Sequence, residues 1–167
     1  KDPVEAAKWL RKAAEQGHAL AQANLGGLHY SGVGVDQDLR ESLRLFRLAA
    51  EQGNAVAQNS LGVMYAAGTG VARDRTEAVT WYRKAAEQGY ALAQSNLGLM
   101  YLKGEGVALD FQQAALWLGK AAEQGDREAQ KGLGVMFMEG RGIERDDRLA
   151  VVWFQKAANQ DSLGAKN

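Results

Sequence analysis

Apolar residues recur at helical spacing in the segment 55–67, and the spacing predicts one amphipathic α-helix, which we call helix A. The residues at i, i+4, i+7 and i+8 that form its apolar face are Ala57, Leu61, Met64 and Tyr65. We expect helix A to end near Gly68, because the sequence Gly-x-Gly-Val over 68–71 is typical of a tight loop with positive φ angles.

A second helix, helix B, is predicted to follow this loop. Asp74 is placed to cap its first turn, since a carboxylate can accept hydrogen bonds from the unpaired N–H groups at a helix start. Gly89 is expected to end the helix as the residue after its last turn. The short turns make helices A and B antiparallel. The inward-facing residues of helix B are predicted to be Ala78, Trp81, Tyr82, Ala85 and Ala86.

The same pattern returns every 36 residues. The string Ala-Ala-Glu-Gln-Gly occurs at 13–17, 49–53, 85–89 and 121–125, and a degenerate copy, Ala-Ala-Asn-Gln-Asp, lies at 157–161. We divide the single array 1–167 into a half unit 1–12, four units at 13–48, 49–84, 85–120 and 121–156, and a partial unit 157–167. One helix pair cannot bury both of its faces, so the units must stack. The sequence therefore predicts an all-α fold, an α/α superhelical solenoid with a concave side.

Positions related by this period form columns, and 16 of the 20 glycines fall in four of them. Gly62 lies inside helix A, where glycine costs about 1 kcal/mol relative to alanine. We expect the column to allow a close approach, with the large Trp81-type side chain packed where no Cβ intrudes. The tryptophans of that column, which we interpret as core residues, are Trp9, Trp81, Trp117 and Trp153, with Leu45 in the remaining place.

The overall composition narrows the classes of function. The chain has 46% hydrophobic residues and equal numbers of acidic and basic residues, 20 of each, so no net field is available to attract nucleic acid. It contains no cysteine, which excludes disulfides and thiolate metal sites. No apolar run approaches the roughly 20 residues that a membrane span needs, so we expect no direct membrane insertion.

The sequence contains no motif or residue spacing typical of a catalytic or metal-binding site. His29 stands in a column that is otherwise aromatic, which favours a packing role, and His18 falls in a solvent-facing turn. The Gly-x-Gly-Val loops lack the Lys-Ser/Thr of a phosphate-binding loop. Asp36, Asp38 and Glu41 lack the ligand order of an EF-hand. We therefore expect no catalytic residue, no metal site and no cofactor.

The repeating residues resemble the Sel1-like repeat, a relative of the tetratricopeptide repeat, across essentially the whole chain. The residues that carry the resemblance are Ala57, Leu61, Gly62, Tyr65, Gly68, Gly70, Val71, Asp74, Ala78, Trp81, Lys84, Ala85, Ala86 and Gly89. Departures are His29 and Phe137 in the tyrosine column, Leu45 in the tryptophan column and Ser42 in an alanine column. The resemblance implies a bacterial adaptor or scaffold in protein complexes, located in the periplasm, secreted or in the cytoplasm.

A partner-binding surface is expected where columns vary from unit to unit. Three such columns form one stripe of helix A, and in helical solenoids the A helices usually line the concave side. We predict an apolar groove with a polar edge that holds a protein or peptide. Its candidate residues are Tyr30, Asn59, Val63, Ser95, Leu99, Leu102, Lys131, Val135 and Met138, with Val63, Leu99, Leu102, Val135 and Met138 as anchors. The alternative is that the stripe only packs against the next A helix.

Other functions stay open beside a non-enzymatic scaffold. The chain could be a regulatory or carrier module of a larger enzyme or membrane-associated protein, or a glycan-binding module that uses Tyr30 and Tyr90. Arginines on helix B are scattered among acids, as on a solvated convex face. The array shows no polar capping elements, so weak self-association through its ends is a further expectation.

Overall fold

The computed structural model describes residues 2–164, and within them the chain forms nine α-helices and no β-strand. The helices are α1 Pro3–Glu15, α2 Ala19–Ser31, α3 Leu39–Glu51, α4 Ala55–Ala67, α5 Arg75–Glu87, α6 Ala91–Lys103, α7 Phe111–Glu123, α8 Arg127–Glu139 and α9 Asp147–Gly164. Helix α4 covers the predicted helix A of 55–67, which is therefore confirmed. The predicted start of another A helix at 165–167 lies outside the described residues.

The helix ends follow from glycine and aspartate, as predicted. Gly68 and Gly70 have φ angles of 76° and 71°, in the left-handed region that a side chain disfavours. At the start of α7 the Asp110 carboxylate accepts hydrogen bonds from the backbone N–H groups of Gln112 and Gln113 at 3.0 and 2.9 Å. Each repeat thus ends its A helix with glycine and begins its B helix with an acidic cap.

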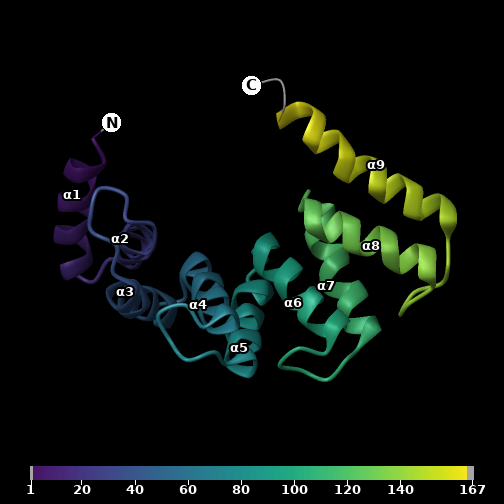
Figure 1. Ribbon diagram of the computed structural model, residues 1–167, viewed down its shortest axis with the longest axis horizontal. Helices are drawn as coiled ribbons and strands as arrows, with labels where there is room; N and C mark the ends of the chain where they lie inside the picture. The colour runs from purple at the N-terminus through teal and green to yellow at the C-terminus, as the bar shows by residue number, and fades with distance from the viewer. Residues whose placement is uncertain (1, 165–167) are drawn as a thin grey trace. The chain divides into compact units, whose positions relative to one another are not determined.

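The helices pack in sequence within two compact units, residues 1–85 and 86–167. In the first unit α2 packs on α1 and on α3, and α3 packs on α4. In the second unit α6 packs on α7, α7 on α8, and α8 on α9, and α6 also contacts α8 directly. Figure 1 shows the last pair, α8 and α9, side by side in green and yellow. Each unit is thus built by the stacking of antiparallel helix pairs.

The cores of both units combine alanines with a few large side chains. In the first unit Ala49, Ala57, Leu61 and Met64 are fully buried in one cluster. In the second unit the equivalent cluster holds Leu118, Leu133 and Met136 beside four alanines. Because alanine leaves little bulk between helices, the backbones approach closely and the remaining large residues fill the space.

The glycine column inside the A helices allows a close approach, but the predicted contact residue was wrong. A Cβ atom at Gly62 would lie 2.5 Å from the Tyr82 ring rather than against Trp81. In the other repeats the same column faces Phe46, Leu118 and Phe154, each directly after the tryptophan column. One residue turns the side chain by about 100° around a helix, so the indole of Trp81 points elsewhere, into the cluster that contains Ala50 and Leu61.

The tryptophan column is only partly buried. Trp81 is 8% exposed, as expected for a core residue, whereas Trp9 is 62% exposed and does not fit that interpretation. Trp9 belongs to α1, which no other helix precedes within the described residues. In each repeat with a tryptophan, the lysine three residues later places its ammonium over the ring, at 4.0 to 4.7 Å from the centroid.

Buried glutamines connect neighbouring helices. In the first unit the Gln22 amide donates to the Ala14 carbonyl at 3.2 Å and accepts from Gln52 at 2.7 Å. In the second unit Gln94 accepts from Gln124 at 2.7 Å, and Gln130 accepts from Gln160 at 2.9 Å. We call these contacts the glutamine bridges. Buried amides need such partners, so each bridge fixes the end of one B helix against the A helix that precedes it.

Candidate functional site

A groove on the A helices of the first unit contains three of the predicted site residues. It lies between α2 and α4 and has a volume of about 240 Å³. The residues that line it are Gly27, Tyr30, Phe46, Asn59, Ser60 and Val63. Of these, Tyr30, Asn59 and Val63 were predicted from the sequence, and the structure brings them together at this groove.

The groove is open because α2 has no side chain at its centre. No heavy atom lies within 4 Å of the position that a Cβ of Gly27 would take. Tyr30 and Val63 are 36% and 37% exposed at the rim, while Phe46 of α3 is 4% exposed and lies beneath them. An apolar side chain of a binding partner could therefore contact the Tyr30 ring and a Val63 methyl group, while the Tyr30 hydroxyl stays in contact with solvent.

Phe46, Ser60 and an apolar extension of this face were not predicted from the sequence. Leu20 and Val56 precede Gly27 and Val63 by seven residues, two helical turns, and are 66% and 46% exposed. The i, i+7 spacing was a signal that could have identified both. Phe46 gave a weaker signal, since it lies on a B helix and is 4% exposed.

In the second unit the predicted anchors are more deeply packed. Leu99 and Leu102 of α6 are half-buried against the cluster around Leu133 and Met136. Val135 is also half-buried, whereas Met138 is 45% exposed. The stripe thus lines an open groove in the first unit, whereas in the second unit Leu99 and Leu102 pack against neighbouring helices.

The polar edge predicted for the stripe is accessible at one of its three residues. Asn59 is 9% exposed and Ser95 is 4% exposed, because these two side chains face the neighbouring helices rather than solvent. Ser95 therefore offers little surface to a partner. Lys131 in the same column is accessible, with 44% of its side chain exposed and an ion pair of 3.1 Å to Glu128.

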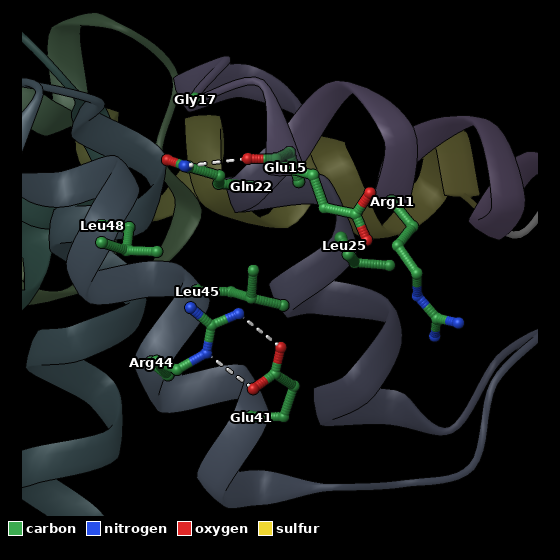
Figure 2. Close-up of a pocket in the computed structure, with 10 residues that line it drawn as sticks. Arg11, Glu15, Gly17, Gln22, Leu25, Glu41, Arg44, Leu45 and Leu48 are labelled. Atoms are coloured by element: carbon green, nitrogen blue, oxygen red, sulfur yellow. Dashed lines mark hydrogen bonds and ion pairs between the residues drawn. The ribbon is translucent and has the colours of Figure 1, made fainter.

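A second pocket, of about 340 Å³, lies among α1, α2 and α3 in the first unit (Figure 2). Its apolar residues are Leu25, Leu45 and Leu48, and its charged residues are Arg11, Glu15, Glu41 and Arg44. We call it the B-side pocket, since two of its three helices are B helices. None of the predicted partner-binding residues lines this pocket.

One ion pair dominates the electrostatics of the B-side pocket. The guanidinium of Arg44 donates two hydrogen bonds to the Glu41 carboxylate, at 2.7 and 2.8 Å, as the dashed lines of Figure 2 show. These hydrogen bonds from Arg44 lower the pKa of Glu41 and raise the pKa of Arg44. Both side chains are partly exposed, at 59% and 32% for Arg44 and Glu41, so the pair contributes at most about 1 kcal/mol to stability.

Groups that could perform other chemistry lie apart in the described residues. No three His, Asp or Glu side chains between residues 2 and 160 are placed to share a metal ion. His29 is half-buried, with Nδ1 at 3.3 Å from the Asp36 carbonyl oxygen, and His18 is exposed. None of the described helices is long and apolar enough to cross a membrane.

A family model of the Sel1 repeat matches the chain five times, at residues 1–18, 19–54, 55–90, 91–126 and 127–162. The unit boundaries drawn from the Ala-Ala-Glu-Gln-Gly string begin six residues before these later matches and stay a prediction. No curated protein matches the sequence.

Solved structures of Sel1 repeat proteins have the same fold. A protective antigen of uropathogenic Escherichia coli with an SLR fold is 42% identical over 92% of this chain, with a TM-score of 0.88. A Sel1 repeat protein from Oxalobacter formigenes is 39% identical over 96% of the chain, with a TM-score of 0.86. The chain covers only 33% and 47% of these two proteins. An immunity protein from Pseudomonas aeruginosa, 22% identical with a TM-score of 0.52, shares the fold over 95% of this chain and 75% of its own.

Proposed function

We propose that this chain, which belongs to the Sel1 repeat family, is a non-enzymatic scaffold that binds a peptide or protein segment on its A helices. Sel1 repeat proteins form α/α solenoids, generally mediate protein–protein interaction and are typically non-catalytic. The groove between α2 and α4 is the observation that supports this site most directly.

The chemistry of the groove suits an apolar anchor of a peptide. Val63 and Tyr30 present exposed surface in the same groove that the buried Phe46 lines. Leu20 and Val56 continue the apolar surface toward the start of each helix. Anchors at helical or extended spacing bind such surfaces by filling a pocket that excludes water, and a few of them carry most of the binding energy.

The test is affinity capture from a bacterial lysate with the wild-type chain and a variant of the A-helix face. The variant carries Val63→Glu, Leu99→Glu and Val135→Glu, and circular dichroism must first show that it keeps its helical content. A matched control carries Leu116→Glu and Val151→Glu, which replace apolar residues with 46% and 53% exposure on the B helices α7 and α9. We expect one specific protein to be retained by wild type and control and lost by the A-face variant.

The other outcomes decide against this site or this function. If the A-face variant retains the same proteins as the wild type, the site lies elsewhere. If only the control loses them, binding occurs on the B helices. If none of the three chains retains a protein, these residues do not form the working surface.

A further inference from the structure

One repeat replaces a tryptophan–lysine pair by two leucines. The other copies contain the pairs Trp9–Lys12, Trp81–Lys84, Trp117–Lys120 and Trp153–Lys156, and in each the ammonium stands over the indole ring. Leu45 and Leu48 occupy the same columns in α3. Neither leucine reaches as far as an indole or a lysine stem, so this repeat lacks bulk that the others have.

The B-side pocket lies where that bulk would be. In the next repeat Trp81 packs in the cluster that contains Ala50, Ala57 and Leu61. The residues 36 positions earlier are Ala14, Ala21 and Leu25, which cluster with Leu45. Ala14 and Leu25 also line the pocket. The pocket is therefore the space that an indole fills one repeat later in the same unit.

We infer that the B-side pocket binds the tryptophan side chain of a partner protein. The inference does not rest on the proposed A-helix site, because the pocket is lined by α1, α2 and α3 and shares no residue with the groove. The bound indole of the partner would take the place of the tryptophan that the other copies of the repeat contain. Large aromatic side chains in pockets are common anchors of protein interfaces.

The charges of the pocket suit a neutral aromatic ring. Arg11 and Arg44 balance Glu15 and Glu41, so the lining has no net charge that would require a charged occupant. Arg44 takes the place of Thr80 one repeat later and supplies the cation that Lys84 provides there. A guanidinium held in plane by a bidentate carboxylate offers its flat face for stacking on an aromatic ring.

The apolar surface of the pocket is divided between a floor and a wall. Leu25 and Leu45 are 3% and 2% exposed and form the floor, while Leu48 is 36% exposed and forms the accessible wall. An arriving indole would therefore contact Leu48 first and cover it. The volume of about 340 Å³ is at the lower end of the range for ligand pockets, which suits one side chain rather than a large ligand.

The experiment titrates the full chain, labelled with ¹³C in its leucine methyl groups, with N-acetyl-tryptophanamide. We expect saturable shifts of the Leu45 and Leu48 methyl signals, caused by the ring current of the bound indole. N-acetyl-leucinamide and N-acetyl-lysinamide serve as comparison probes and are expected to shift these signals at least tenfold less at equal concentration.

The matched variant is Leu45→Trp/Leu48→Lys, which restores the pair found in the other repeats. It should fold with a melting temperature no lower than that of the wild type and bind the tryptophan probe at least tenfold more weakly, observed through the remaining Leu25 methyl groups. Leu48→Lys alone, at a partly exposed position, provides a second variant in case the double variant does not fold. Unmoved methyl signals, equal shifts with the leucine probe, or undiminished binding by the folded variant would each overturn the inference.

Discussion

Replacing Gly62 by alanine would place one methyl carbon of α4 against the Tyr82 ring of α5. The new Cβ would lie 2.5 Å from two carbon atoms of the Tyr82 ring, whereas favourable carbon–carbon contacts begin at about 3.5 Å. Tyr82 is 4% exposed, so its ring cannot turn into solvent without losing its own burial. The substitution therefore requires the two helices to separate.

Two opposing effects set the magnitude. Alanine is favoured over glycine inside a helix by about 1 kcal/mol, while overpacking of a filled interior typically costs about 1–3 kcal/mol and occasionally more. The short contact with an aromatic ring puts Gly62→Ala at the upper end of that cost, so we expect a net loss of about 1–2 kcal/mol. Gly119→Ala in α7 is the matched control. No atom lies within 4 Å of its Cβ position, so we expect it to stabilise the chain by up to about 1 kcal/mol.

The assay is urea unfolding of the full chain, followed both by circular dichroism and by tryptophan fluorescence. The two signals must coincide before a single free energy of unfolding is assigned, because repeat arrays do not always unfold in one step. We expect the two variants to move the urea midpoint in opposite directions with an unchanged slope. If Gly62→Ala raised the midpoint as Gly119→Ala does, close approach to Tyr82 would not be the reason for glycine at this position.

Three further predictions concern single groups. The Ser42 hydroxyl is fully buried without a hydrogen-bond partner in the described structure. Ser42→Ala should therefore raise the free energy of unfolding by about 1 kcal/mol in the same urea assay. A loss of stability would contradict this. Asp110→Ala removes the acceptor for two N–H groups at the start of α7 and should cost about 1 kcal/mol, whereas Asp110→Asn should be nearly neutral. Burial raises the pKa of Tyr82 to about 12 from an ordinary value of about 10. The unfolded chain therefore loses this proton first, so the contribution of the neutral phenol to stability is complete below about pH 10 and is lost as the pH rises toward about 12. The urea midpoint should fall across that window in the wild type, and Tyr82→Phe should fall less if this phenol is responsible.

The sequence predicted the helix pairs well because their ends depend on local residues. Gly68 and Asp110 act through backbone angle and N–H groups within a few residues, so their positions alone set where helices stop and start. The contact of Gly62 was predicted only in part. Which of two adjacent residues faces a glycine depends on the rotation of one helix against another, and this is a property of packing rather than of spacing.

The candidate site was less predictable for the same reason. Tyr30 and Val63 lie on an exposed face, whereas Leu99 on the equivalent stripe is half-buried, although the spacing treats them alike. The glutamine bridges were missed because glutamine in a helix usually indicates a solvated surface. The recurrence of Gln22 and Gln52 at the 36-residue period was the available signal that these amides are structural.

The glutamine bridges also bear on how such a gene can change in length. In each bridge the two glutamines are 30 residues apart, less than the 36-residue period, and both lie within one match to the Sel1 repeat. An in-frame duplication or deletion of 36 codons therefore recreates every donor and acceptor pair at its junction, wherever within the repeat the recombination occurs. A shift of one codon would instead rotate a buried amide away from its partner. Recombination between copies of the repeat can thus lengthen or shorten the protein by whole repeats, because the glutamine bridges at the junction are the same as those elsewhere in the array.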